Sequence, residues 1–290
     1  MNGALGAISD FYELSKPRII FLLLVTTGAA MLMAQRGLPP LGLALYTLLG
    51  GALAAASAGA FNCIYDSDID ALMRRTQQRP IPSGRISALS AAVFATALGI
   101  GSFGMLFVLV NPLAACLALA GNVYYVVVYT MLLKRVTPLN IVIGGAAGAI
   151  PPLVGWAAVN GNVGGPAIGL FALIFLWTPP HFWALALMTE IDYEKARIPM
   201  LPNVCGVART KSEIVVYSVI LVVSSLVLYP LHVMGSLYFV AAAILGAVFI
   251  FDAVRTLQDK GQAWARTLFK YSLLYLALMC VFMVVDRVIG

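Results

Sequence analysis

Three polar residues at helical spacing follow a long apolar segment and could together hold a cation. The segment 41–61 carries no charge and is long enough to cross a bilayer. Asn62, Asp66 and Asp70 follow at i, i+4 and i+8, so a continuing helix would place them on one face, with Asp68 pointing away. Two carboxylates this close repel each other, and a helix C-terminus adds to the cost. A divalent cation is the simplest group that would offset both penalties, and Mg²⁺ takes oxygen ligands from one or two carboxylates plus substrate phosphates.

Basic residues favour this cation site over the alternative, a solvated polar loop at a membrane boundary. Those that follow the carboxylates at once are Arg74, Arg75, Arg79 and Arg85. A second acidic group ends another apolar segment and consists of Glu190, Asp192 and Glu194. Two acidic groups with many guanidinium groups suggest a diphosphate held through Mg²⁺. The alternative is that membrane loops simply collect charges. No GxxxxGK[ST] motif is present, which argues against nucleotide hydrolysis.

The composition restricts the chain to an integral membrane protein of the all-α class. Of 290 residues, 61% are hydrophobic and 10% are charged, against about 25% charged residues in soluble domains. The four cysteines form no CxxC pair, so no structural zinc site is indicated. We predict one transmembrane domain over residues 1–290 with nine helices, at about 18–35, 41–61, 88–110, 113–131, 137–159, 167–188, 213–231, 235–252 and 269–289.

The distribution of charge predicts the orientation in the membrane. Sixteen of the 18 Lys and Arg residues precede the first helix or lie after helices 2, 4, 6 and 8. The positive-inside rule then places the N-terminus and these loops in the cytoplasm and the C-terminus outside, in a bacterial-type cytoplasmic membrane. Eleven of the 12 acidic residues lie on the same side, which favours a polar reaction site there. The net charge of +6 therefore reflects topology, and no nucleic-acid partner is expected.

Several helices carry residues that could shape a binding site. Helices 2 and 6 both end in an acidic group and lie four spans apart, which hints at a parallel four-helix repeat. The pairs Pro151-Pro152 and Pro179-Pro180 are each expected to break a spanning helix. His181 is a candidate substrate contact, with a satisfied core histidine as the alternative. Aromatic candidates for stabilising a carbocation, or for simple packing, are Tyr124, Tyr125, Tyr129, Trp156, Trp177 and Trp183.

Several ordered motifs within residues 15–205 carry a family resemblance. They are Asn62-x-x-x-Asp66-x-x-x-Asp70, Arg75-Thr76-x-x-Arg79-Pro80-Ile81-Pro82-x-Gly84-Arg85, Lys134-Arg135-x-Thr137-Pro138-x-Asn140, Trp177-Thr178-Pro179-Pro180-His181-Phe182-Trp183, Asp192-Tyr193 and Ile198-Pro199-Met200-Leu201-Pro202. The first resembles the acidic motif of the UbiA-type intramembrane prenyltransferases, which are nine-helix bundles. The others are similar to the branch of that superfamily that farnesylates protohaem IX.

The resemblance implies a fold, a reaction and a set of site residues. The fold would be a nine-helix transmembrane bundle around a central cavity open to the cytoplasmic side. The reaction would be Mg²⁺-dependent transfer of a farnesyl group from farnesyl diphosphate to a vinyl group of haem B, with addition of water to give haem O. Asn62, Asp66, Asp70 and Asp192 would be catalytic, and all but Asn62 would be metal ligands. The implied substrate contacts are Arg75, Arg79, Arg85, Lys134, Arg135, His181 and Tyr193.

One position departs from the wider superfamily. Relatives that act on quinone precursors carry a second DxxxD, whereas the residue four after Asp192 is Ala196. Either Glu190 or Glu194 substitutes for the missing acid, or a second metal is held more loosely. The alternative functions are an aromatic or quinone-precursor prenyltransferase and, from another class, a small transporter. The expected partners are farnesyl diphosphate, haem B, the lipid bilayer, and a downstream haem-modifying enzyme or oxidase assembly protein.

Overall fold

The chain folds into a bundle of helices that confirms the predicted class. The structure is a computed structural model that describes residues 2–290, with side chains from residue 6 onward, and this part contains no strand. Its elements are α1 (Asn2–Leu14), α2 (Pro17–Gln35), α3 (Leu41–Tyr65), α4 (Ser67–Asp70), α5 (Ala88–Leu109), α6 (Pro112–Val123), the π-helix η1 (Tyr124–Leu133), α7 (Asn140–Ala149), α8 (Pro151–Asn160), α9 (Gly165–Met188), α10 (Glu190–Lys195), α11 (Leu201–Val227), α12 (Ser236–Gln258) and α13 (Ala263–Ile289). Within residues 2–290, nine segments are long and apolar enough to span a membrane, as predicted.

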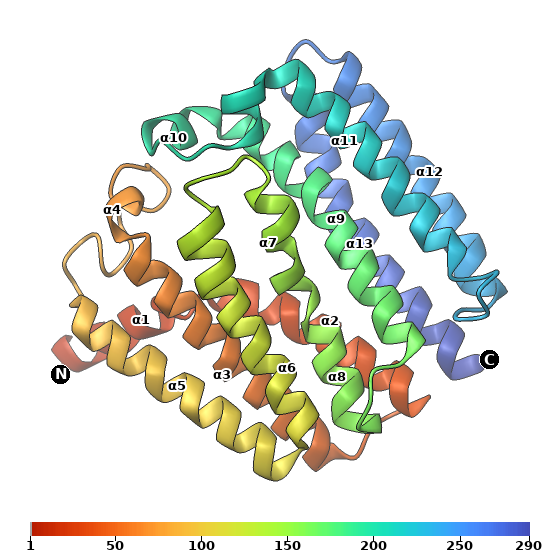
Figure 1. Ribbon diagram of the computed structural model, residues 1–290, viewed down its shortest axis with the longest axis horizontal. Helices are drawn as coiled ribbons and strands as arrows, with labels where there is room; N and C mark the ends of the chain where they lie inside the picture. The colour runs from red at the N-terminus through yellow and green to blue at the C-terminus, as the bar shows by residue number, and fades with distance from the viewer. Residues whose placement is uncertain (1) are drawn as a thin grey trace.

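The spanning helices pack in two groups joined by central ones (Figure 1). On one side lie α3, α5 and α6, and on the other lie α11, α12 and α13. Between them, α7 and α8 contact α9, while α2 packs on α8, α3 and α13. The larger apolar core surrounds α9 and includes Leu170, Leu173, Tyr238, Phe249 and Tyr275. Because the first spanning helix lies against the last, the helices form a closed arrangement.

Glycines allow two of the central contacts to be very close. A Cβ atom at Gly155 of α8 would lie 2.2 Å from the carbonyl oxygen of Thr27 in α2, so a side chain here would collide with backbone. A Cβ atom at Gly144 of α7 would lie 2.2 Å from the ring of Tyr129 in η1. Small residues in these helices therefore serve packing.

The two proline pairs behave differently. Pro151-Pro152 separates α7 from α8, as predicted. The prediction of a break at Pro179-Pro180 is wrong, because α9 continues through both prolines. Neighbouring helices hold it in place: the Trp177 indole N–H donates to the carbonyl of Ser272 in α13 at 2.8 Å. Proline is tolerated in membrane helices where adjacent helices supply such support.

The fourth span is α-helical only in its first half, a feature that the hydrophobic pattern did not predict. From Tyr124 to Leu133 the backbone is π-helical. The N–H of Lys134 donates to the carbonyl of Tyr129, five residues back, at 2.9 Å. A π-turn holds more residues than an α-turn, so residues beyond it are rotated relative to an unbroken α-helix. This segment therefore sets the direction in which Lys134 and Arg135 leave the span.

Two other features differ from prediction. The N-terminal segment forms α1, whose Phe11 and Leu14 pack with Cys63 of α3 and Phe94 of α5. The seventh span begins at Leu201, not near residue 213, because its first turns are polar and carry no hydrophobic signal. Gly206 adopts φ 82° within it and kinks the helix.

Candidate functional site

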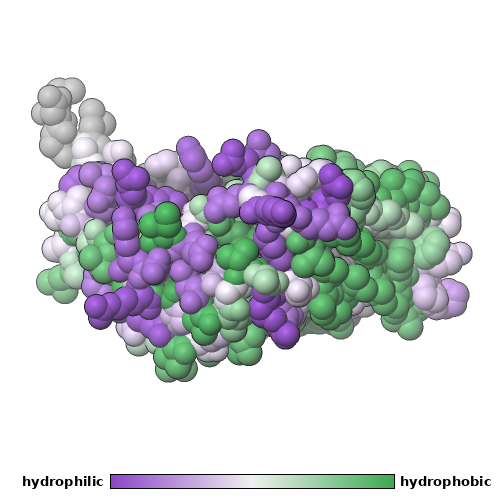
Figure 2. Space-filling model, turned by 90° about the horizontal axis from the view of Figure 1, so that it is seen from above, coloured by the Kyte–Doolittle hydropathy of each residue, from purple (hydrophilic) through white to green (hydrophobic). Residues whose placement is uncertain are grey.

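Both acidic groups lie at one polar end of the bundle. α4 follows α3 and α10 follows α9, and Figure 1 shows the two short helices at the same end. Seen from that end, hydrophilic side chains gather over it, whereas hydrophobic ones dominate toward α11 and α12 (Figure 2). Ile69 of α4 and Met73 pack in one apolar cluster with Ala196 and Ile198 beyond α10. The two acidic helix ends thus pack against each other.

Asn62, Asp66 and Asp70 lie on one side of the chain although the helix is interrupted between them. α3 ends at Tyr65, and Asp66 has φ −88° and ψ 2°. The N–H of Asp66 still donates to the Asn62 carbonyl at 2.9 Å, and that of Asp70 to the Asp66 carbonyl at 2.8 Å. These bonds preserve the helical spacing across the junction. All three side chains are buried, with Asp66 0% exposed.

Basic side chains from other elements compensate each buried carboxylate. The Lys134 ammonium contacts Oδ2 of Asp66, and Arg79 Nη1 lies 2.6 Å from Oδ2 of Asp70. From sequence, a bound cation was the simplest way to offset the repulsion between the two acids. The structure shows that the chain also supplies its own positive charges, so the site holds both signs before any ligand binds.

Arg135 connects the buried acids with the surface. Its guanidinium donates to both carboxylate oxygens of Asp68, at 2.7 and 2.8 Å, and to the carbonyl of Tyr65 at 2.7 Å. The same group lies 3.8 Å from Oδ1 of Asp66. The hydrogen bonds from Arg135 lower the pKa of Asp68. Asp68 therefore faces away from the other two acids, as predicted, and orients the guanidinium of Arg135 beside Asp66.

Burial shapes the pKa values of the basic partners. The pKa of Lys134 is lowered, because burial disfavours its charged form more than Asp66 favours it. Burial also acts against charge on Arg79, but the opposing interactions, of which that with Asp70 is the largest, leave the pKa of Arg79 raised. Burial and the carboxylate partner therefore act in opposite directions on the charge of both basic groups.

Asp66 has an oxygen that suits a metal ion. Its Oδ1 atom is buried and accepts no hydrogen bond, whereas Oδ2 accepts from Asn62 Nδ2 at 2.7 Å and from Lys134. A buried acceptor without a donor is costly unless a ligand satisfies it. Across residues 2–290, no group of three or more His, Cys, Asp or Glu side chains is arranged to hold a metal alone. Mg²⁺ typically binds through one or two carboxylates with substrate phosphates as further ligands, and the unpartnered Oδ1 of Asp66 fits such a site.

The second acidic helix supplies fewer ligands. Asp192 is half-buried on α10, and Ala196 is buried in the apolar cluster with Ile69 and Met73. A carboxylate at position 196 would be surrounded by apolar side chains, which explains why a second acid does not fit here. Burial raises the pKa of Tyr193, and Arg75 acts to lower it, so these two implied substrate contacts lie near each other.

Two implied substrate contacts have other partners. Arg85 forms ion pairs with Asp10 and with Glu13, the latter at 3.0 Å, which tie its loop to α1. His181 stacks between Trp177 and Phe269, with ring centroids 4.2 and 4.6 Å away. Its Nδ1 atom lies 2.7 Å from the hydroxyl of Ser272. These contacts favour structural roles for both residues, and for His181 they match the core alternative.

Tyr125 and Tyr129 are the aromatic candidates beside the carboxylates. Their ring centroids lie 5.4 Å apart, and Tyr129 packs on the cluster that contains Ile69. The indole of Trp156 instead donates to Asn162 in the loop after α8. The indole of Trp183 packs edge-on against Tyr217, within the core.

Sequence reasoning missed Lys16 and Thr130. The Lys16 ammonium donates to Oδ1 of Asn62, and Lys16 has φ 57° where α1 turns into α2. Thr130 accepts a hydrogen bond from Asn62 Nδ2 at 3.0 Å. Lys16 could have been predicted to lie at the membrane surface near the site, because it directly precedes an apolar spanning helix that begins at Pro17. Thr130 could not have been predicted, since its position depends on the π-helix.

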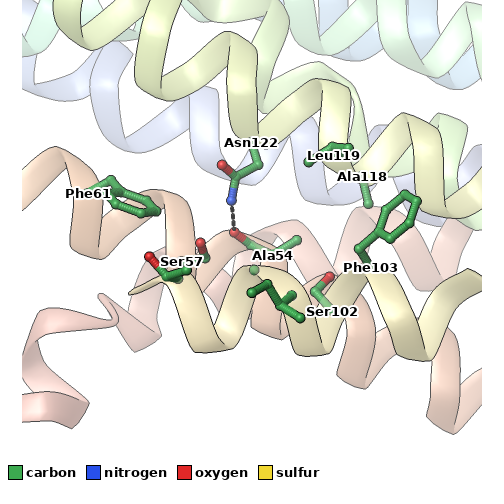
Figure 3. A pocket seen from close by; sticks show the side chains of 11 residues that line it. Ala54, Ser57, Phe61, Ser102, Phe103, Ala118, Leu119 and Asn122 are labelled. Atoms are coloured by element: carbon green, nitrogen blue, oxygen red, sulfur yellow. Dashed lines mark hydrogen bonds between the residues drawn. The ribbon is translucent and has the colours of Figure 1, made fainter. Parts of the chain in front are cut away.

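A hollow of about 210 Å³ lies away from the carboxylates, between α3, α5 and α6 (Figure 3). Asn122 Nδ2 donates across it to the carbonyl of Ala54 at 3.0 Å. The hydroxyl of Ser102 donates to the carbonyl of Gly50 at 2.7 Å. In both bonds a side chain, from α6 or from α5, donates to a backbone carbonyl of α3, so the three helices are tied together around the hollow.

Comparisons with known proteins agree with the fold. The model of the UbiA prenyltransferase family matches residues 23–277. A relative from Gloeobacter violaceus named "Protoheme IX farnesyltransferase" is 55% identical over 98% of this chain and 93% of its own length. A solved structure of a digeranylgeranylglyceryl phosphate synthase has a TM-score of 0.82 at 19% identity, over 98% of this chain and 99% of that one. A UbiA homologue from Archaeoglobus fulgidus bound to DMAPP and Mg²⁺ has a TM-score of 0.70 at 18% identity, over 96% and 99%.

Proposed function

The chain belongs to the UbiA prenyltransferase family, and we propose that it transfers a farnesyl group from farnesyl diphosphate to a vinyl group of haem B, giving haem O. The allylic C–O bond breaks, and its electron pair leaves with the diphosphate. The vinyl electrons form the new C–C bond, and water adds to the resulting cation with loss of a proton. The observation that carries this proposal is the buried Asp66 carboxylate, in which Oδ2 contacts Lys134 and Oδ1 accepts no hydrogen bond.

The carboxylates hold the metal in this proposal. Asp66 and Asp70 bind Mg²⁺, and Asp192 contributes from α10. When bound, Mg²⁺ supplies positive charge that stabilises the departing diphosphate. The Archaeoglobus homologue bound to DMAPP and Mg²⁺ supports this use of a divalent ion.

The basic residues hold the diphosphate. Arg79, Lys134 and Arg135 already stand against the carboxylates, and Arg75 lies near Tyr193. They form charge-assisted hydrogen bonds with phosphate oxygens, which stabilise the charge that develops as the C–O bond breaks. Lys16 joins this set through its contact with Asn62.

The helices exclude water from the cation. In this proposal the farnesyl group lies in a cavity open to the cytoplasmic side, and Tyr125 and Tyr129 present aromatic faces to the farnesyl cation. The N-terminus and the site lie in the cytoplasm, with the C-terminus outside, in a bacterial-type cytoplasmic membrane. A haem-modifying enzyme or an oxidase assembly protein receives the product.

Chromatography of haems extracted from membranes that contain the chain tests this function. With haem B, farnesyl diphosphate and Mg²⁺ we expect haem O, and we expect none when farnesyl diphosphate is omitted or Mg²⁺ is chelated. Asp66→Asn should lower the rate at least about a hundredfold, because the metal loses an anionic ligand. Its thermal unfolding should remain cooperative.

Other outcomes would contradict the proposal. Prenylation of a quinone precursor in place of haem B would move the chain to another branch of the family. Full activity of Asp66→Asn would remove the metal assignment. Accumulation of a solute in vesicles without any prenylated product would support the transporter alternative.

A further inference from the structure

Thr130 makes two hydrogen bonds that together determine the role of its hydroxyl oxygen. The side chain is fully buried in η1. Its hydroxyl donates to the carbonyl of Tyr125 at 2.9 Å, and its oxygen lies 3.0 Å from Nδ2 of Asn62. A hydroxyl has one proton, and a carbonyl can only accept. Toward Asn62, the Thr130 oxygen can therefore act only as an acceptor.

This restriction selects one of the two orientations of the Asn62 amide. With its NH₂ group toward Thr130, the same group also donates to Oδ2 of Asp66 at 2.7 Å. The carbonyl oxygen of Asn62 then faces the ammonium of Lys16. A flipped amide would place acceptor against acceptor at Thr130 and Asp66, and donor against donor at Lys16.

The orientation of Asn62 also determines which oxygen of Asp66 stays free. Both Asn62 Nδ2 and Lys134 Nζ donate to Oδ2, and Oδ1 accepts no hydrogen bond. Two donors on one oxygen leave the other available to a cation. The amide thus helps to present a single, buried carboxylate oxygen.

The π-helical backbone gives Thr130 a hydrogen bond that differs from those of threonines in the α-helices. Other threonine hydroxyls in the helices bond three or four residues back: that of Thr26 donates to Leu23, that of Thr47 to Leu43 and that of Thr178 to Ile174, each at 2.8 Å. In η1 the hydroxyl of Thr130 reaches five residues back to Tyr125. The backbone geometry therefore holds Thr130 against α3.

We propose that Thr130 is a positioning residue for the prenyl-transfer reaction. Its hydroxyl donates to the Tyr125 carbonyl within the π-helix, so its oxygen accepts from Asn62 Nδ2. The Asn62 amide is thereby held with Nδ2 donating to Asp66 Oδ2, which leaves Asp66 Oδ1 free for the metal–diphosphate ligand. The inference rests on the proposed function only in that the site binds a metal and a diphosphate.

Binding of inorganic diphosphate in the presence of Mg²⁺, followed by calorimetry on the purified chain, tests this role. Thr130→Val keeps the shape and removes the hydroxyl, and we expect it to weaken binding about tenfold, the effect of one buried hydrogen bond. Thr130→Ser should bind within about twofold of the unmodified chain. Thr47→Val is the matched control, because Thr47 is equally buried and bonds only to its own helix.

A double-mutant cycle with Asn62→Asp separates positioning from general packing. A carboxylate at position 62 has no donor to orient, so Thr130→Val should change binding little in that background. Thermal unfolding of Thr130→Val and of Thr130→Ala shows whether a variant is folded. If Val weakens binding equally in both backgrounds, or Ser fails to restore it, the proposal is overturned. Diphosphate binding does not depend on the acceptor, so a wrong haem assignment would leave this result readable.

Discussion

Each buried carboxylate of the site has a basic partner that comes from a different part of the chain. Lys134, which contacts Asp66, lies 68 residues further along the sequence, whereas Arg79, which contacts Asp70, lies nine residues away. Removal of one partner of a buried ion pair leaves an uncompensated charge, which is far more costly than the pair itself is stabilising. When an anionic ligand binds and draws Lys134 or Arg79 toward itself, Asp66 and Asp70 therefore need another positive partner.

Arg79 and Arg85 belong to the same motif but are expected to respond differently to mutation. Arg79→Gln removes a cation beside Asp70, and we expect the KM for farnesyl diphosphate to rise at least about tenfold. Arg85→Gln removes exposed contacts to Asp10 and Glu13 and to Ser83 and Gln78 of its own loop, none of them site carboxylates, so KM should stay within about twofold. The loss in unfolding free energy should be below about 1 kcal/mol.

Steady-state kinetics and thermal unfolding of the two variants check this prediction. The two substitutions are matched in chemistry, so the comparison controls for the loss of a guanidinium group. An equal rise in KM for both would restore Arg85 as a diphosphate contact.

At this scale the spacing of the acids was readable from sequence, but their partners were not. The i, i+4 and i+8 positions of Asn62, Asp66 and Asp70 predict one face, and the structure confirms it across the junction of α3 and α4. Lys16 and Thr130 reach Asn62 from 46 and 68 residues away. Such contacts depend on how distant helices dock, which residue types and local spacing do not determine.

Helix termini show how the elements are held where the backbone needs partners. The carboxylate of Asp286 in α13 accepts from the N–H of Gly235 at 2.5 Å and from that of Tyr238 at 3.1 Å. These donors are the residue before α12 and a residue of its first turn, where N–H groups have no partner within the helix. An acceptor on the last helix thus caps its neighbour at the end of the bundle opposite to the carboxylate site.

We expect Asp286→Ala to lower the free energy of unfolding by about 1–2 kcal/mol, because the buried N–H of Tyr238 and the N–H of Gly235 lose their acceptor. Asp286→Asn retains a side-chain oxygen and should lose less. Thermal unfolding in detergent measures both, and haem O formation by the folded protein should be unchanged. A larger loss with Asn than with Ala would contradict the capping role.

Helix number was predictable because apolar length is a direct consequence of bilayer thickness. The backbone conformation within a spanning helix was less predictable. Pro179-Pro180 predicts a break that contacts such as that between Trp177 and Ser272 prevent, and the π-helical bonding of Tyr124–Leu133 leaves no trace in the hydrophobic pattern. Both depend on neighbouring helices.

The polarity of the whole bundle agrees with one orientation in the membrane. Hydrophilic side chains gather at the end that carries α4 and α10 (Figure 2), and most Lys and Arg residues lie in the segments on that side. Charged groups at one end cannot cross the hydrocarbon core cheaply, so the two orientations differ greatly in free energy during insertion.

Reporter fusions test this orientation. Green fluorescent protein placed at position 78, in the loop after α4, should fluoresce, and alkaline phosphatase placed after Gly290 should be active, because it folds only outside the cytoplasm. Exchanging the two reporters is the control, and both signals should then disappear. Fluorescence after Gly290 with phosphatase activity at position 78 would reverse the proposed orientation.

The contact between α2 and α13 has a consequence for how the molecule is made. A ribosome delivers α2 to the bilayer first and α13 last, yet each forms part of the wall on which the other packs. Until α13 has been synthesised, the surface of α2 that packs on it is covered only by lipid or by the insertion machinery. The contact between α2 and α13 therefore forms only at the end of synthesis, so a chain truncated before α13 lacks the packing that joins the first and last spans.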